Sequence, residues 1–244
     1  MRVIQFVAFA VASAAMAAPV SADVTVRSRT VQEDDGRRIT EVTEYRKGLK
    51  IRTDSSTPGL TSASIILDVA TGRTVMLWHD SKTATEHDFY QTRVPAARGS
   101  VSATPPSITP TSETREIAGS TCTVYRVRAT FPMSGIEISE PATILMEGST
   151  CVVKDGPGQA DFLRIQRALA ERARDDNPML SMTLEMAALG VPFASEMTMS
   201  VGGNAPNAER RKMVSHTTEV TSISTDSIPD SIFEIPAGYT VTKR

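Results

Sequence analysis

The residues whose side chains could do catalytic or metal chemistry stand apart from one another along this chain of 244 residues. His79, His87 and His216 form neither a His-x-x-x-His nor a His-Glu-x-x-His pattern, and such spacings place two imidazoles on one metal ion. Ser195 lies in Phe-Ala-Ser-Glu-Met, without the glycines of a nucleophile elbow. The sequence therefore predicts no enzyme, no metal and no cofactor, and His79 and His87 are expected to be solvated side chains near strand ends.

The two cysteines, Cys122 and Cys151, are the other residues with reactive side chains, and they are 29 positions apart. In an oxidising compartment this pair favours a disulfide, which would stabilise the fold by ~3.5 kcal/mol in the chain-entropy description. The alternative is a metal or nucleophile site, but no Cys-x-x-Cys or paired histidine accompanies the cysteines. We expect the disulfide.

The N-terminus indicates that the protein is exported. Val3–Ala17 is nearly all apolar, and Val20–Ala22 offers small residues to a signal peptidase, with cleavage before Asp23. Ala15–Ala17 is a competing cleavage site. A membrane anchor is the alternative, but the apolar run is shorter than the roughly 20 residues that a spanning helix needs. We therefore expect residues 1–22 to be a signal peptide and the mature protein to be periplasmic.

Most of the mature chain alternates apolar and polar residues with the period of a β-strand. Turn residues such as Asp34-Asp35-Gly36 and Ala70-Thr71-Gly72 separate these short segments, which is typical of an antiparallel meander. The expected strand segments are 23–30, 38–45, 49–52, 64–69, 74–78, 121–131, 142–153, 193–201 and 211–223.

Two segments have the period of a helix. Gln159–Arg174 and Met179–Leu189 each carry apolar residues at helical spacing. One-sided apolar helices among many strands must cover a sheet, so we expect an α+β fold, a curved antiparallel half-barrel covered by two helices.

The segment Arg93–Glu116 is rich in serine, threonine and proline, and it is expected to be an exposed, extended loop. It could also be read as a linker between two domains. The flanking segments are too small to form separate cores, so residues 23–244 are expected to be one domain.

The composition excludes several classes of partner. The net charge is −2, and only 5% of the residues are aromatic, with a single tryptophan. Nucleic-acid binding is therefore not expected, because it relies on basic surfaces and aromatic stacking. The short basic run Arg210-Arg211-Lys212 could contact phosphate head groups, but we expect it to be a solvated turn.

A set of short segments resembles, in the same order, a bacterial envelope family that is labelled as a domain of unknown function. The matching segments are Tyr45–Arg52, Ile66–Asp68, Ile117–Tyr125, Cys151–Gly158, Gly190–Phe193 and Phe233–Tyr239. The resemblance implies a fold similar to the Lol-type periplasmic lipoprotein carriers, a half-barrel of strands closed by helices. It implies no catalytic residues.

Two functions follow from these expectations. A half-barrel with an apolar lining could bind a lipid or an acyl chain, as a carrier or sensor, since concave apolar surfaces are common ligand sites and methionine adapts to varied shapes. Alternatively, these residues fill a core, and the protein docks another envelope protein through a sheet edge or the Ser/Thr/Pro-rich segment. The expected ligand-binding residues are Phe162, Ile165, Leu169, Met182, Met186, Phe193, Met197 and Met199.

Overall fold

The structure is a computed structural model, and it describes residues 23–34, 36–90, 104–132, 142–172, 178–203 and 209–243. The expected signal peptide, residues 1–22, lies outside the described residues.

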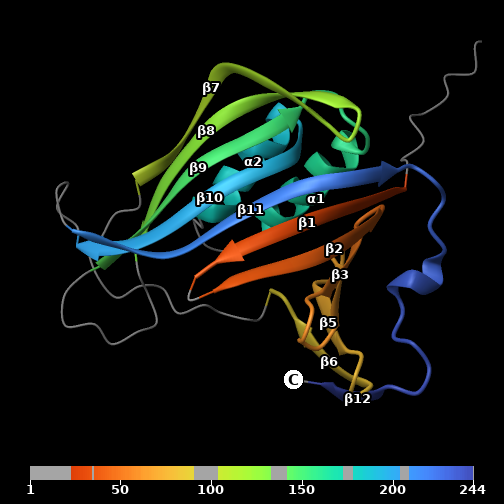
Figure 1. The fold of residues 1–244 in the computed structure, drawn as a ribbon. Coiled ribbons are helices and arrows are strands. Elements are labelled where there is room, and N and C mark those ends of the chain that lie inside the picture. Colours follow the sequence, from red (N-terminus) through yellow and green to blue (C-terminus); the bar gives the residue numbers. More distant parts are fainter. Residues whose placement is uncertain are drawn as a thin grey trace, which may run out of the picture.

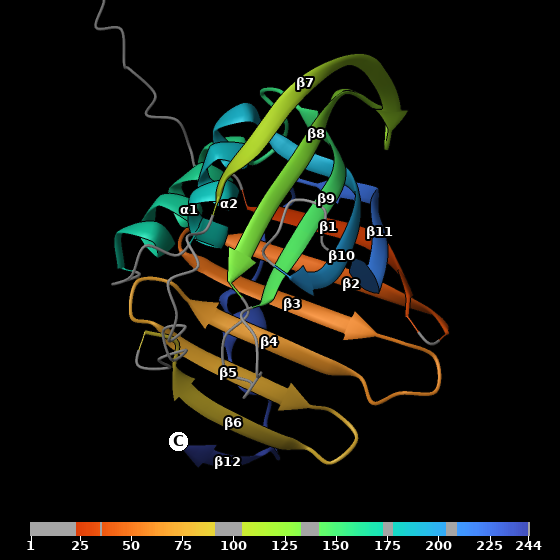
Figure 2. The ribbon, with the colours of Figure 1, turned by 90° about the vertical axis from the view of Figure 1, so that its left-hand side faces the viewer.

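A single twelve-stranded sheet forms the body of the protein (Figure 1). Its strands are β1 (Val24–Glu33), β2 (Arg37–Lys47), β3 (Lys50–Ser56), β4 (Ala63–Asp68), β5 (Arg73–Trp78), β6 (Thr83–Asp88), β7 (Thr104–Ile117), β8 (Ser120–Pro132), β9 (Ala142–Val153), β10 (Val191–Gly203), β11 (Arg210–Ser224) and β12 (Thr240–Lys243). The strand order is β12-β6-β5-β4-β3-β2-β1-β11-β10-β9-β8-β7. All neighbours are antiparallel except β12, which pairs with β6 in parallel. Figure 2 shows the strands following one another in this order around a strong curve.

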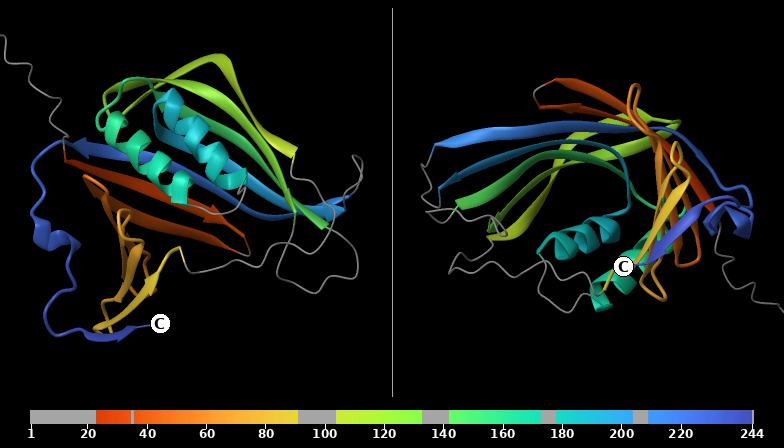
Figure 3. Two further views of the ribbon diagram at one scale, coloured as in Figure 1. Left: turned by 180° about the vertical axis from the view of Figure 1, so that it is seen from behind. Right: turned by 90° about the horizontal axis from the view of Figure 1, so that it is seen from below.

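Two helices, α1 (Gln159–Arg172) and α2 (Pro178–Leu189), lie on one face of this curved sheet, inside its concavity (Figure 3). The α1 helix buries Ile165 and Leu169, which are four residues apart and so lie on one side of a helix. This apolar stripe has to be covered, and the concave face of the sheet covers it. The expected fold class, a curved α+β half-barrel with two covering helices, is confirmed.

The expected loop over Arg93–Glu116 is wrong for the part that the structure describes. Residues 104–117 form β7, an edge strand paired with β8, and residues 91–103 lie outside the described residues. Proline is tolerated in an edge strand because one side of that strand needs no backbone donor, and threonine favours strands. The ladder shifts between Thr104 and Ser107 and between Pro110 and Thr114, so bulges absorb the prolines.

The chain between β11 and β12 crosses the opposite, convex face of the sheet as a strap, residues 225–239 (Figure 1). It contains the short 3-10 helix η1 (Asp230–Phe233). Ile228 and Phe233 are buried against an apolar cluster formed by Ile66, Val75, Leu77 and Ala84. Sequence periodicity did not predict β6, η1 or β12, because none carries an alternating apolar pattern.

Candidate functional site

A methionine-rich cluster of side chains fills the space between α2 and the concave face of the sheet. Met182 of α2 packs against Met146 of β9 and Met197 of β10, together with Val127 and Ala129 of β8. Met182 and Met197 are only 5% and 7% exposed. A further set of partly buried side chains surrounds the cluster: Ile108, Phe131, Met186 and Met199. The four methionines expected to bind ligand are thus brought together, and two of them are core residues.

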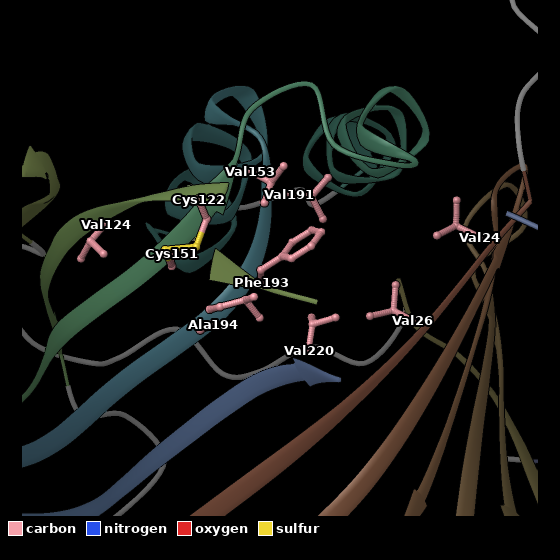
Figure 4. Packing of buried hydrophobic residues seen from close by; sticks show 11 residues of the cluster. Val24, Val26, Cys122, Val124, Cys151, Val153, Val191, Phe193, Ala194 and Val220 are labelled. Carbon is pink, nitrogen blue, oxygen red and sulfur yellow. A yellow bond between two sulfur atoms is a disulfide. The ribbon is translucent and has the colours of Figure 1, made fainter. Parts of the chain in front are cut away.

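The remaining four expected ligand residues lie in other parts of the same layer. Ile165 and Leu169 of α1 pack on Val69, with Leu49, Ile51, Leu67 and Ala168 around them. Phe193 is 1% exposed and lies between Val191, Val26 and Val220, near the start of β10 (Figure 4). Phe162 is half-buried, and its ring stacks on the guanidinium of Arg46, 4.7 Å from the ring centre.

These contacts place the eight residues in three packed clusters and one cation–π pair. A pocket among the described residues lies elsewhere, as a shallow depression on the face opposite the helices. Arg115, Val124, Cys151 and Glu196 border it.

Next to the α1 cluster lies a part of the concave face that neither of the two described helices covers. Leu67 of β4 packs under α1, and Ile65, two residues earlier, projects from the same face. Met76 of β5 is paired with Ile65, and Trp78 lies two residues further along β5. Ile65 and Trp78 are 44% and 39% exposed, and Met76 is half-buried. We name Ile65, Met76 and Trp78 the open apolar patch.

Hydroxyl side chains border the open apolar patch along the ladder. Thr53 of β3 is paired with Ile65, Thr85 of β6 with Met76, and Thr83 of β6 with Trp78. Apolar side chains with a few polar groups at their margin are the usual composition of a small-molecule site. Sequence patterns alone did not single out this patch, although the alternation Ile65, Leu67, Val69 placed Ile65 on an apolar face.

His79 follows Trp78 of this patch, and the expectation that it is a solvated side chain is wrong. It belongs to a series of hydrogen bonds on the convex side. His79 is half-buried; its Nε2 lies 2.6 Å from Ser64 Oγ, and its Nδ1 lies 2.6 Å from Tyr239 Oη in the last part of the strap. Ser64 Oγ donates to Asp54 Oδ1 at 2.5 Å, and Arg52 donates to the same oxygen and to the carbonyl of Ile232.

This Ser–His pair does not form a catalytic site. Ser64 is 1% exposed, so no substrate carbonyl can reach its Oγ, and the carboxylate of Asp54 binds the serine instead of orienting the imidazole. These hydrogen bonds join β3, β4 and the turn after β5 to Ile232 and Tyr239, and they hold the strap on the sheet.

The expected disulfide is confirmed: Cys122 and Cys151 are bonded between β8 and β9, and both are buried (Figure 4). Above it, Arg115 of β7 donates to Glu113 at 2.8 Å and to Glu196 of β10 at 3.2 Å. These hydrogen bonds raise the pKa of Arg115. The end of β7 therefore covers the disulfide, which excludes it from exchange with solvent thiols.

The described residues contain no cluster of three or more histidine, cysteine or acidic side chains that could hold a metal ion. Neither described helix is long and apolar enough to cross a membrane. Arg210 of the basic run is half-buried and donates to Thr143 from the start of β11, whereas Arg211 and Lys212 are exposed on the strand.

No protein-family model matches the chain, and no curated protein matches it by sequence. Among solved structures, it is similar to an uncharacterized conserved protein from Thermus thermophilus, with 7% identity, a TM-score of 0.41 and 92% of each chain covered. It is also similar to a LolA superfamily protein from Nitrosomonas europaea, with 7% identity, a TM-score of 0.33, and 88% of this chain and 91% of that chain covered. At these scores neither likeness says what this chain binds.

Proposed function

We propose that this chain is an exported protein of the bacterial envelope that binds an acyl chain or another apolar ligand on its concave face, as a carrier or sensor. The observation that carries the proposal is the open apolar patch, in which Ile65, Met76 and Trp78 lie uncovered inside a curved sheet. Uncovered apolar side chains cost free energy in water, and a ligand that covers them recovers it. The disulfide and the apolar N-terminus support export to the periplasm.

The size and place of the patch favour a small ligand over a protein partner. The exposed area of three side chains on two neighbouring strands is far smaller than the ~800 Å² that each partner buries in a stable protein interface. The patch also continues from Leu67, which packs under α1, so a narrow acyl chain can lie along it. We propose binding rather than catalysis, since the hydrogen-bonded pair Ser64 and His79 is shielded from substrate and holds the strap.

A docking module for another envelope protein is the second candidate. The observation that favours it is the dense packing of Met182, Met197 and Ile165, which leaves the layer between helices and sheet filled. If this candidate holds, the protein binds no lipid, and a sheet edge such as β7 would make the contact.

The two candidates are separated by the lipids that copurify with the mature protein, residues 23–244, detected by native mass spectrometry after gentle isolation. The binding proposal predicts one bound lipid or fatty acid per chain, which is lost in Ile65→Asp and kept in the control Met213→Asp. Met213 is exposed to a similar extent, 43%, but lies on β11. No bound lipid in the unaltered protein, together with no saturable binding of added fatty acids, would leave the docking module.

A further inference from the structure

Two buried polar atoms without a hydrogen-bond partner lie where the start of α1 meets the concave face. They are Nη1 of Arg46 on β2 and Oε1 of Gln159 at the start of α1. Within the described residues, unpartnered buried side-chain atoms of this kind are rare, and the third belongs to Arg210, at the start of β11. Because nearly all buried polar groups in native proteins have a hydrogen-bond partner, two unpartnered polar atoms on adjoining elements require an explanation.

Both unpartnered atoms belong to the contact between the start of α1 and strands β1 and β2, which we name the seam. Gln159 and Phe162 are three residues apart on α1, so they lie on one side of its first turn, and Phe162 stacks on Arg46. Val24, the β1 partner of Arg46, is so close to Gly158 that a Cβ there would lie 2.5 Å from Val24 Cγ2. The start of α1 is therefore pressed against Arg46 and Val24.

The guanidinium of Arg46 is fixed in orientation, with one edge left over. Its Nε donates to Glu44, and the Phe162 ring covers one of its faces. Arg46 is 9% exposed, so water does not compete freely for Nη1. An N–H of a buried guanidinium beside the start of a helix, where the helix dipole is positive, is suited to an oxyanion.

We infer that this seam is the head-group subsite of the ligand, and that the ligand is an amphiphile with an oxyanion head, a carboxylate or a phosphate. This inference rests on the proposed function. Nη1 of Arg46 donates to the head-group oxygen, and the Gln159 amide, which carries both a carbonyl and an NH2 group, turns to complete the contact. Gln159 and Phe162 are half-buried, so rotation of these two partly exposed side chains would admit the head group to the seam.

The ladder connects this subsite to the open apolar patch. Glu44, next to Arg46 on the same face of β2, is paired with Thr53, and Thr53 is paired with Ile65. Two strand spacings, about 10 Å, separate β2 from β4. An acyl chain whose head group lies at Arg46 can therefore extend across Thr53 onto Ile65 and Met76.

Calorimetric titration of the mature chain tests this with ligands that share one acyl chain. Oleate and oleyl phosphate carry the oxyanion head, oleyl alcohol is the neutral control, and acetate and inorganic phosphate are the heads alone. We expect the two oxyanion ligands to bind about tenfold or more tightly than the alcohol, since a charge-assisted hydrogen bond is worth that factor. The free anions should bind too weakly to measure.

Variants then assign the preference to the seam. Arg46→Met should reduce the preference for the oxyanion head to about onefold without weakening the binding of oleyl alcohol, and Gln159→Leu should reduce it in part. Arg126→Met, an exposed arginine on β8, is the matched control and should keep the preference. If Arg46→Met fails to fold, the unaltered protein and Gln159→Leu still decide.

The outcomes are distinct. Equal affinity of the unaltered protein for oleate and oleyl alcohol would overturn this inference and keep the proposed function. Binding of inorganic phosphate as tight as that of oleyl phosphate would overturn the assignment to an amphiphile. No binding of any of the chains would overturn both the inference and the function on which it rests.

Discussion

The methionine cluster gives the sharpest prediction about stability, because the structure and the ligand-lining hypothesis expect different results for the same side chain. Met197 of β10 is 7% exposed and packs against Met146, Met182 and Val127. If it is a core residue, Met197→Ala removes buried methylenes and the thioether and leaves a cavity, at a cost of about 2–5 kcal/mol in the free energy of unfolding.

Urea denaturation of the mature chain followed by far-UV circular dichroism measures this cost from the shift in midpoint at constant slope. Met213→Ala is the matched control: its side chain is 43% exposed, and the change should stay within about 0.5 kcal/mol. Ligand binding at the open apolar patch should survive Met197→Ala. A loss below about 0.5 kcal/mol with abolished lipid binding would refute the core assignment and restore Met197 as a ligand contact.

Three further perturbations test other parts of the structure. Replacing both Cys122 and Cys151 by alanine opens a loop of 29 residues and should cost ~3.5 kcal/mol by the same urea assay, with the reduced unaltered protein losing a similar amount; no loss would show that the crosslink is dispensable. Gly148→Ala should destabilise by at least ~1–3 kcal/mol, because a Cβ there would lie 1.9 Å from the carbonyl oxygen of Glu196, and a neutral result would mean that β9 and β10 are not in the described register. Arg73 donates to Glu86 at 2.9 Å, and this hydrogen bond lowers the pKa of Glu86 from its usual 4.5. The ionised carboxylate therefore stabilises the fold above pH 4.5. This stabilisation is lost as the pH falls through the lowered pKa. Glu86→Gln should therefore flatten the fall in stability below about pH 4.5, and an unchanged acid limb would contradict the pairing.

The sequence was informative where one face of an element is buried. The alternation at Tyr125, Val127 and Ala129 predicted β8, and the spacing of Ile165 and Leu169 predicted α1, because burial on one side imposes a period that the sequence displays. A separate argument, from the compartment and the number of cysteines, predicted the disulfide.

The sequence was uninformative where neighbours outside the element decide its structure. β7 is held by pairing with β8 despite its prolines, and β12 is an exposed strand that exists because β6 offers an unpaired edge. The ligand residues were assigned from apolar type alone, which cannot separate packed Phe193 from uncovered Ile65. That distinction depends on where the two helices end on the concave face, which no local pattern encodes.

The protein offers its own probe for the central proposal, because its single tryptophan, Trp78, lies in the open apolar patch. A fatty acid with bromine on its acyl chain quenches tryptophan only on contact. Titrated into the mature chain, it should quench Trp78 fluorescence saturably, and non-brominated fatty acid should reverse the quenching. Saturable binding by calorimetry without quenching would place the ligand elsewhere and contradict the account.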